Sequence, residues 1–478
     1  MNTTAQTYRL GMVGLGVMGR NLLLNMADHG FAVAGYDKDR GRVTALLQEA
    51  GTPAGQRAAI GGAAAPEQFI AMLRPPRAVM ILVPAGPVVD AVIGDLLPHL
   101  SPGDLLIDGG NSFFKDTDLR AKMLADRGIA FLGVGVSGGE AGARRGPSIM
   151  PGGPRDAYDR IHPVFEAIAA RVGDEPCVAY LGPGSAGHYV KMVHNAIEYG
   201  LMQLIAETYD LMKRGLGLSD DDLHAIYDAW NQTEPAGYLL EITAEIFLKI
   251  DDRTGKRLVD VILDAAKQKG TGMWASQNAM DLHIPVPTID AAVEMRDLSG
   301  LEEERRAASR ILRGPEPAPP VDREMVLPQI RNALYAGMIV TYAQGLALLR
   351  VASRTYGYDL DLEAVARIWR GGCIIRAALL ERIRDAYRAR PDLPNLLVDP
   401  GLAGDVTARA PHLRAVVCRG AAAGIPVPGL AAALAYLDGY RSAWLPTNLI
   451  QAQRDYFGAH TYERVDAKGV FHTEWSHD

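Results

Sequence analysis

The chain has 478 residues, of which 48% are hydrophobic and 22% are charged, so it has the composition of an ordinary globular protein of about two to four domains and not of a disordered one. Its net charge of -7 disfavours general attraction to nucleic acid or to an anionic membrane. The three cysteines, Cys177, Cys373 and Cys418, are scattered without a CxxC pair, so they predict neither a disulfide framework nor a zinc site, and we expect no metal.

The N-terminal segment runs from a short polar arm directly into an apolar stretch. It has no basic region followed by an apolar signal core, and no run of about 18 apolar residues follows it. We therefore expect a soluble, cytoplasmic protein.

Residues 8–135 alternate short apolar runs with helical patterns. The apolar runs end in Gly, Asp or Pro and read RLGMVGLG, FAVAGYD, AVMILVP, DLLIDGG and IAFLGVGVSGG. Strands that alternate with helices indicate a parallel, doubly wound sheet. The sequence thus predicts an α/β, Rossmann-like domain over residues 1–184.

Almost no strand pattern remains after about residue 185, and long helical patterns dominate. They predict an all-helical domain over residues 185–443 and a C-terminal tail over 444–478. Within the helical part, VHNAIEYGLMQLIAE from residue 193 resembles IRNALYAGMIVTYAQ from residue 330, and each is followed by a segment that ends in Trp. We expect a duplicated helical unit, with copies near residues 187–315 and 324–440.

The first apolar run ends in the pattern GxGxxG, formed by Gly14, Gly16 and Gly19. The first glycine allows a tight turn, the second lets the backbone approach a pyrophosphate, and the third lets the helix pack on the strand. The following helix N-terminus supplies free N–H groups and partial positive charge. A dinucleotide site is the expected function, and a tight turn in a protein that binds another ligand is the alternative.

The second apolar run ends in VAGYDKDR. Asp37 lies 18 residues after Gly19, where a carboxylate accepts hydrogen bonds from the ribose hydroxyls of NAD and repels a 2′-phosphate. Lys38 and Arg40 are cations within reach of a phosphate, and an exposed strand end of mixed charge is the structural alternative.

A glycine-rich loop, VSGGEAGARRGPSIMPGG, spans residues 136–153. Ser137, Gly138 and Gly139 follow a strand directly, at the edge where α/β folds place their ligands. The glycines serve equally well as simple turn residues.

One helical face, in KMVHNAIEYG at residues 191–200, is unusually polar. It carries Lys191, His194, Asn195, Glu198 and Tyr199 at helical spacing, a set found neither on a buried apolar face nor on an ordinary solvated one. The second copy of the repeat has Pro and Tyr in place of the lysine and the glutamate, so the charged pair is not required for the fold.

Further cations are scattered along the chain. KQKGTGMW at residues 267–274 offers Lys269, Thr271 and backbone amides as an anion nest. Arg296, Arg454 and His460 are isolated, and surface charge is their ordinary explanation.

Together these blocks resemble the signature segments of the decarboxylating 6-phosphogluconate dehydrogenase family, within the β-hydroxyacid dehydrogenase superfamily. The resemblance covers essentially the whole chain, and its most specific blocks are KMVHNAIEYG and the tail block NLIQAQRDYFGAHTYER. It implies oxidation and decarboxylation of 6-phosphogluconate in the pentose phosphate pathway, and a homodimer in which each tail reaches the active site of the other subunit.

The resemblance also implies roles for individual residues. Lys191 would be the general base and Glu198 a general acid. The substrate would be held by Asn111, Ser137, Gly138, Gly139, His194, Asn195, Tyr199, Lys269, Thr271 and Arg296, with Arg454 and His460 supplied by the other subunit. The coenzyme would be held by Gly14, Gly16, Val17, Met18, Gly19, Asp37, Lys38, Val83 and Asn111.

The chain departs from the family pattern at positions that bind the coenzyme in the family. The family usually has Ala in place of Gly16 and Asn-Arg-Ser/Thr at the end of the second strand, where this chain has Asp37, Lys38 and Asp39. Loss of the guanidinium and gain of a carboxylate both disfavour a 2′-phosphate, so we expect NAD rather than NADP. Pro84, Ala141 and Met273 are further departures, and the first removes a lysine near the coenzyme.

The proposed chemistry sets requirements on the protonation and the separation of Lys191 and Glu198. Burial and neighbouring cations are expected to lower the pKa of Lys191 toward neutrality. Glu198 lies two helical turns away, about 10.5 Å along the axis, which is too far for an ordinary i, i+4 ion pair. A non-decarboxylating β-hydroxyacid dehydrogenase is the main alternative; an inactive coenzyme-binding protein and a nucleic-acid binder are disfavoured by the intact pair and by the net charge.

Overall fold

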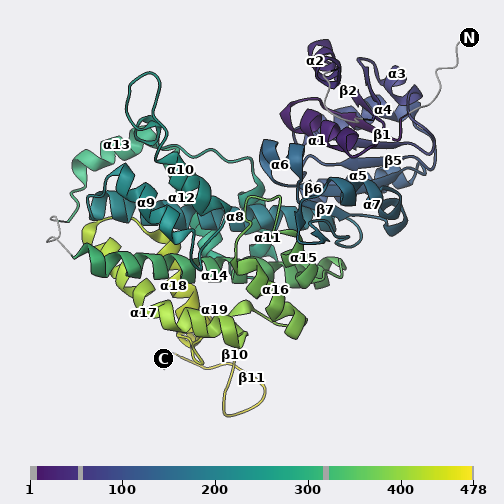
Figure 1. The fold of residues 1–478 in the computed structure, drawn as a ribbon. Helices are drawn as coiled ribbons and strands as arrows, with labels where there is room; N and C mark the ends of the chain where they lie inside the picture. Colours follow the sequence, from purple (N-terminus) through teal and green to yellow (C-terminus); the bar gives the residue numbers. More distant parts are fainter. Residues whose placement is uncertain (1–7, 52–57, 316–321, 476–478) are drawn as a thin grey trace, which may run out of the picture.

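The computed structural model describes residues 8–51, 58–315 and 322–475, and it consists of a sheet-containing N-terminal part, a larger helical part and a short C-terminal tail (Figure 1). The sheet lies at the upper right of the view, and the tail lies along the lower side of the helical part (Figure 1). A doubly wound α/β domain followed by a large helical region is the architecture predicted from the sequence, and it is confirmed.

The N-terminal part is built on one seven-stranded sheet with the strand order β3-β2-β1-β4-β5-β6-β7. All neighbouring pairs are parallel except β6 and β7, which are antiparallel. The strands are β1 Leu10–Val13, β2 Val33–Tyr36, β3 Ile60–Ala63, β4 Ala78–Ile81, β5 Leu105–Asp108, β6 Ala130–Val136 and β7 Ile149–Gly152.

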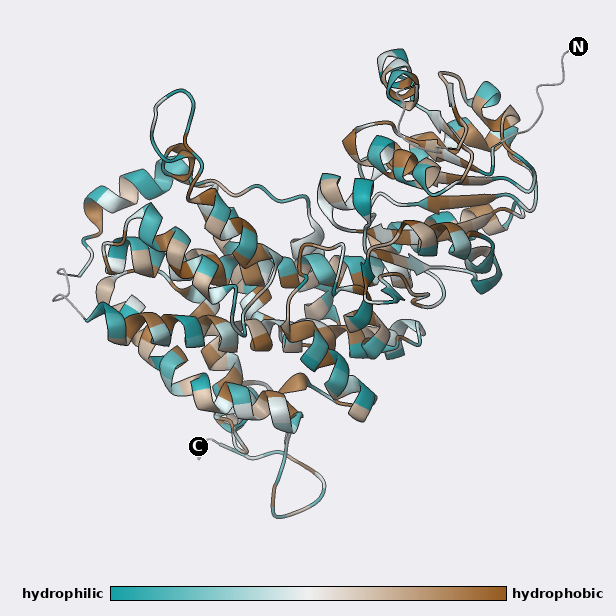
Figure 2. Cartoon of the chain, viewed as in Figure 1, coloured by the Kyte–Doolittle hydropathy of each residue, from teal (hydrophilic) through white to brown (hydrophobic). Residues whose placement is uncertain are grey.

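Helices cover both faces of this sheet, which buries its apolar strands, drawn in brown in Figure 2. One apolar cluster joins the sheet to α1, α2 and α7, and another joins the opposite face to α3, α4 and α5. The helices are α1 Val17–Asp28, α2 Arg40–Ala50, α3 Pro66–Ala71, α4 Pro87–Leu96 with the 3-10 turn η1 Leu97–His99, α5 Phe114–Ala125, α6 Gly139–Arg145 and α7 Arg155–Ile168. A short hairpin, β8 Arg171–Val172 and β9 Glu175–Pro176, follows them.

Two strands of the sheet were not among the five predicted runs. Strand β3 reads IGGA, and β7 reads IMPG inside the segment interpreted as a glycine-rich loop. Glycine and proline have low strand propensity, so neither segment shows an apolar run. The loop after β6 is consequently shorter than expected, and β7 returns antiparallel beside it.

The helical part is organised around two long buried helices, α8 Ala186–Asp210 and α14 Arg323–Tyr356. By length and composition α14 could cross a membrane, but 89% of its apolar window is buried, as in the core helix of a soluble protein. The remaining elements are η2 Leu211–Gly215, α9 Asp220–Trp230, α10 Tyr238–Ile246, η3 Leu258–Val261, α11 Thr271–Asp281, α12 Pro287–Ser299, α13 Glu302–Ile311, α15 Leu362–Ile368, α16 Leu379–Ala389, η4 Leu396–Val398, α17 Pro400–Ala423 and α18 Pro428–Tyr440.

Reciprocal capping links the two halves of the helical part. Glu207 of α8 accepts hydrogen bonds from the backbone N–H groups of Gly429 and Leu430, at 2.6 and 2.8 Å, in the first turn of α18. Gln344 of α14 accepts from the N–H of Thr288 at 3.1 Å, in the first turn of α12. Each long helix thus caps a helix of the other half, and this pairing supports the predicted duplication.

The tail consists of α19 Thr447–Gly458 and the hairpin β10 Tyr462–Glu463 and β11 Val470–Phe471. Asp455 of α19 is fully buried and accepts hydrogen bonds from the N–H groups of Thr461 and Thr473, the indole of Trp475 and the imidazole of His472. Although burial opposes ionisation, these bonds lower the pKa of Asp455 to about 2. One ionised carboxylate therefore holds the helix and the hairpin together.

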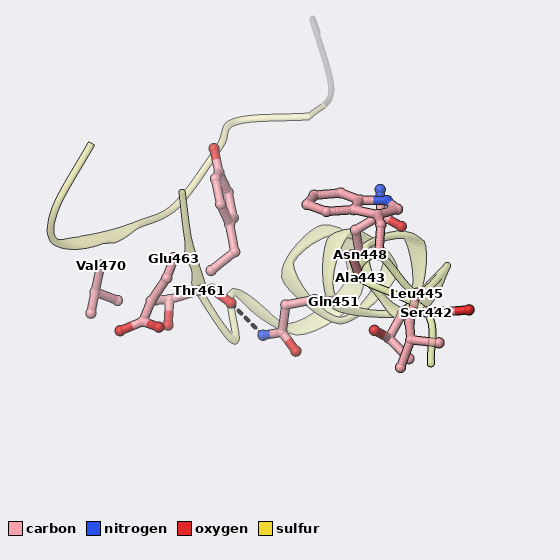
Figure 3. A pocket seen from close by; sticks show the side chains of 11 residues that line it. Ser442, Ala443, Leu445, Asn448, Gln451, Thr461, Glu463 and Val470 are labelled. Carbon is pink, nitrogen blue, oxygen red and sulfur yellow. Dashed lines mark hydrogen bonds between the residues drawn. The ribbon is translucent and has the colours of Figure 1, made fainter. Parts of the chain in front are cut away.

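A pocket of about 670 Å³ opens between the start of the tail, α19 and the hairpin. Figure 3 shows this pocket, in whose wall Gln451 Nε2 of α19 donates to Thr461 O at 2.6 Å. Large apolar side chains of the tail are exposed, among them Trp444 at 63% and Phe457 at 74%. Such exposure is unusual for a monomer and is typical of a surface that a partner covers.

Candidate active site

The main candidate site is a cavity of about 900 Å³ between the sheet and the helices α8, α11 and α12. Its sheet side is formed by the loops that follow β1, β4 and β5 and by Val136 at the end of β6, where a doubly wound sheet binds its ligands. The predicted site residues that line it are Gly16, Val17, Met18, Gly19, Val83, Asn111, Asn195, Glu198, Tyr199, Lys269, Thr271 and Arg296.

The glycine-rich turn has the backbone geometry expected for a dinucleotide site. Gly14 has a φ of 92°, and a Cβ on Gly19 would lie 1.9 Å from the oxygen of Gly14, so neither position accepts a side chain. A Cβ on Gly16 would meet nothing within 4 Å, because the backbone there faces the open cavity at the N-terminus of α1. An open glycine beside free helix N–H groups fits a pyrophosphate.

Asp37 lies at the end of β2 and braces this turn. Its Oδ2 accepts from the N–H of Leu15 at 2.8 Å and from Arg42 Nη1 at 3.3 Å. Lys38 is directed to α4, where its Nζ pairs with Asp95 at 2.7 Å. The cation beside Asp37 is therefore Arg42, and not the neighbouring lysine considered from the sequence.

Asn111 joins the two sides of the cavity. It has a φ of 56°, and its side-chain amide bonds to both backbone groups of Val136, at 3.1 and 3.3 Å. This pairing fixes the loop after β5 against the end of β6. It leaves Asn111 on the cavity wall between the coenzyme side and the helical side.

The polar face of α8 is ordered as the helical spacing predicts. Lys191 is 4% exposed, and its Nζ lies 3.3 Å from His194 Nδ1. The Nδ1 of His194 in turn lies 3.9 Å from Glu198 Oε2. His194 thus lies between the lysine and the glutamate. No direct ion pair between Lys191 and Glu198 is present among the described contacts, as their separation predicts.

Burial sets the protonation of all three groups. It lowers the pKa of Lys191 from 10.5 to about 8, while Glu198 and Cys373 act in the opposite direction. Neighbouring cations, which we expected to contribute, are not the cause. Burial and then Lys191 lower the pKa of His194 well below 6.5, and burial raises the pKa of Glu198 against the pull of Lys191 and Arg296. Near neutral pH the site can therefore hold a neutral imidazole and readily exchange protons at the lysine.

Ser137 reaches the same histidine from the sheet side. Its Oγ lies 3.3 Å from His194 Nε2, at the end of β6. Gly138 has a φ of 106°, and a Cβ there would lie 2.6 Å from the backbone oxygen of Gly372. Gly139, with a φ of 60°, begins α6. Backbone conformation therefore favours glycine at both positions, and close packing also requires it at Gly138.

A cationic end of the cavity is built from segments far apart in the sequence. The Arg296 guanidinium lies 3.7 Å from the ring centre of Tyr199 and donates to the backbone oxygen of Lys267 at 3.0 Å. Lys269 and Thr271 lie on the same wall, at the start of α11. The predicted anion nest and the predicted lone arginine are therefore brought together.

Arg454 and His460 lie elsewhere in the same chain. Both are exposed in the tail, and neither lines the cavity of its own chain.

Several residues around the site were not predicted. Trp274 lines the cavity and packs on Phe113 with ring centres 5.0 Å apart. Two others come from the second half of the helical part. Trp369 packs edge-on against His194 with ring centres 5.7 Å apart, and Cys373 interacts electrostatically with Lys191. Trp274 ends the motif KQKGTGMW, so the sequence could have predicted it as a site residue. Trp369 and Cys373 lie in no motif that would have predicted their place beside α8.

Two departures from the family pattern are also placed. Pro84 lines the coenzyme side of the cavity. Met273 is 38% exposed and is absent from the lining, while Lys269 is present. Among the described residues, no group of three or more His, Cys, Asp or Glu side chains is arranged to hold a metal ion.

Two family models match the chain. One, described as the NAD binding domain of 6-phosphogluconate dehydrogenase, matches residues 9–182, and the other, described as the C-terminal domain of 6-phosphogluconate dehydrogenase, matches residues 187–475. Together they span both the sheet and the helices that form the cavity.

Full-length relatives carry both coenzyme types in their names. The NADP(+)-dependent, decarboxylating 6-phosphogluconate dehydrogenase of Bacillus subtilis is 51% identical over 98% of this chain and 99% of its own length. The NAD(+)-dependent, decarboxylating enzyme of the same organism is 48% identical, with the same coverage. A Plasmodium falciparum 6-phosphogluconate dehydrogenase, solved in its apo form and with NADP+ and 6-phosphogluconate, matches with a TM-score of 0.93 and 43% identity over 98% of this chain and 100% of that one.

Proposed function

The chain belongs to the decarboxylating 6-phosphogluconate dehydrogenase family of oxidoreductases, and from this premise we propose that it converts 6-phospho-D-gluconate to D-ribulose 5-phosphate and CO2 in the pentose phosphate pathway. The observation that carries the proposal is the buried Lys191 on the polar face of α8, beside a cavity with a glycine-rich turn on one wall and cationic groups on another. We propose a cytoplasmic location.

Lys191 is the proposed base and acid at C3. In its neutral form it takes the proton of the C3 hydroxyl, and NAD(P)+, when bound, accepts the hydride from C3. The protonated amine then donates to the C3 carbonyl oxygen, which draws electrons from the breaking C1–C2 bond as CO2 leaves. A pKa of about 8 suits both directions of proton transfer at neutral pH.

Glu198 is the proposed acid that protonates the enediol at C2 of the substrate, the carbon that becomes C1 of ribulose 5-phosphate. Burial raises its pKa, which favours the protonated form that this step requires. The imidazole of His194 between the two groups keeps them from pairing directly. Each can therefore serve a different carbon of the substrate.

The substrate is proposed to lie along the wall formed by α8 and α11. Its sugar-acid end would be held by Asn111, Ser137, Gly138, Gly139, His194 and Asn195, and its phosphate by Tyr199, Lys269, Thr271 and Arg296. Arg296 offers the planar fork of donors that suits phosphate recognition.

NAD is the proposed preferred coenzyme. The carboxylate of Asp37 lies beside the glycine-rich turn, where it accepts hydrogen bonds from ribose hydroxyls and repels a 2′-phosphate. Lys38 is paired with Asp95 and Arg42 with Asp37, so both of these cations already have a carboxylate partner. The proposed coenzyme contacts are Gly14, Gly16, Val17, Met18, Gly19, Asp37, Lys38, Val83 and Asn111.

A homodimer with exchanged tails is proposed to complete the site. The exposed apolar side chains of the tail and the position of Arg454 and His460 outside their own cavity support it. In this arrangement the two cations would meet the substrate phosphate in the partner subunit.

The proposal is tested with purified protein, 6-phosphogluconate and either NAD+ or NADP+. Reduced coenzyme and CO2 released from C1 are expected in equal amounts. Reduced coenzyme without CO2 would favour a non-decarboxylating β-hydroxyacid dehydrogenase, the second candidate, which shares the glycine-rich turn and the lysine.

A further inference from the structure

Arg120 of α5 is a buried guanidinium, 4% exposed, close to the candidate site but outside its lining. Its Nε donates to Asp90 Oδ1 at 2.6 Å, and its Nη2 donates to Asp90 Oδ2 at 3.1 Å and to Gly86 O at 3.0 Å. Its Nη1 donates to Ser112 Oγ at 3.2 Å and to Asp108 Oδ2 at 3.4 Å. Because a guanidinium has five N–H donors, every donor of Arg120 has a partner.

These partners belong to two loops that form opposite parts of the cavity. Gly86 and Asp90 belong to the loop after β4 and to the first turn of α4, and residues 82–86 of this loop line the coenzyme side. Asp108 and Ser112 flank the loop after β5, whose residues 109–111 line the wall next to α8. Arg120 therefore fixes the spacing of the two loops.

The two loops depend on Arg120 to different degrees. Without it, Asp108 would still accept from the N–H of Gly110 at 2.9 Å and from Ser112 Oγ at 2.7 Å, and its backbone oxygen would still accept from His188 Nε2 at 2.9 Å. The described side-chain contacts that tie Gly86 and Asp90 to the neighbouring loop are those of Arg120. Loss of the guanidinium would thus release the coenzyme loop and leave the substrate wall in place.

We propose that Arg120 is a positioning residue for the coenzyme. It holds the loop at residues 83–86 against the loop after β5, and so fixes the position of the coenzyme relative to α8. This inference rests on the proposed function, because it takes residues 83–86 as coenzyme contacts. Through Asp108 and His188 the same network reaches α8, one turn before Lys191.

The test is Arg120→Lys, which keeps the charge but replaces a five-donor fork by a compact ammonium that cannot span both loops. Loss of charged hydrogen bonds of this kind predicts a rise of about fivefold or more in KM for the better of NAD+ and NADP+. The Kd of 6-phosphogluconate, measured without coenzyme, is expected to stay within about twofold because the substrate wall keeps its other bonds.

Arg384→Lys is the matched control. Arg384 is also 4% exposed and is bonded to carboxylates, but its partners Glu175 and Glu363 lie outside the cavity lining. We expect its Tm to fall while the coenzyme KM stays within about twofold of wild type. A similar coenzyme effect in both variants would show a general loss of packing and would overturn the inference.

If Arg120→Lys does not fold, Asp90→Asn tests the same role of Arg120. The Asp90 side chain is 58% exposed, so its replacement leaves the packing of the core unchanged. It is expected to raise the coenzyme KM about threefold or more with an unchanged substrate Kd. A coenzyme KM within about twofold of wild type, or a parallel rise in the substrate Kd, overturns the role of Arg120. A wild-type protein that does not reduce coenzyme with 6-phosphogluconate would instead count against the proposed function.

Discussion

The protonation of Lys191 predicts how the first chemical step responds to pH. Burial lowers its pKa from 10.5 to about 8, a difference that corresponds to roughly 3 kcal/mol against the charged form. At pH 7 this leaves about 10% of the lysine neutral, about 300-fold more than an unperturbed amine would supply. Because the first step needs the neutral amine, its rate should rise with pH and become constant above about 8.

The assay is rapid mixing at low substrate concentration, with the first turnover of reduced coenzyme followed by absorbance. Measurements between pH 7 and 10 keep the substrate phosphate doubly ionised, since its second pKa is about 6. Glu198→Gln is the control, because Glu198 is proposed to act only after CO2 has left. The variant should still show a first turnover that rises with pH and then becomes constant, and because the Glu198 charge raises the pKa of Lys191, the midpoint of this rise should lie below that of wild type.

Two results would refute this reasoning. A first-turnover rate that continues to rise through pH 10 would mean that Lys191 titrates as an ordinary amine. A rate that does not change between pH 7 and 9 would mean that another group removes the hydroxyl proton.

Three further changes test other parts of the structure. Asp37→Asn removes the repulsion of a 2′-phosphate, so the ratio of kcat/KM for NAD to that for NADP should fall about tenfold; an unchanged ratio contradicts the proposed coenzyme preference. Glu207→Ala leaves two buried N–H groups of α18 without an acceptor and should lower the free energy of unfolding by about 2–4 kcal/mol at pH 5. Burial raises the pKa of Glu207 from 4.5 to about 7, so the contribution of this side chain to stability is complete below pH 4.5 and declines as the pH rises to 7. Urea unfolding of Glu207→Ala should therefore show a smaller loss of stability at pH 8 than at pH 5. The matched variant Gln344→Ala should lose the same free energy of unfolding at both pH values. Asp455→Ala removes the carboxylate that holds the tail together and should raise KM for 6-phosphogluconate about tenfold with little change in coenzyme KM; an unchanged substrate KM would argue against a tail residue in the site.

The order of strands and helices in the N-terminal part was predictable because each of its main strands is an apolar run followed by a turn residue. The glycine spacing after β1 and the position of Asp37 after β2 follow directly from that order. The polar face of α8 was also predictable, because helical spacing alone brings Lys191, His194 and Glu198 together.

Other features depend on contacts that no local pattern encodes. Strand β7 is formed by IMPG, whose glycine and proline conceal its pairing with β6. The low pKa of Lys191 comes from its burial, to which close packing on Gly135 of β6 contributes, and not from the cations that its charge led us to expect. The five bonds of Arg120 likewise join loops that are separate in sequence.

The central claim is that Lys191 performs the acid–base chemistry at C3. The most direct measurement compares wild type with Lys191→Met for both reduction of coenzyme and release of CO2 from C1, with circular dichroism to verify the fold. We expect both activities to be abolished together while the fold is retained, since the same amine is proposed to act in both steps. Turnover by Lys191→Met within about tenfold of wild type would contradict the account.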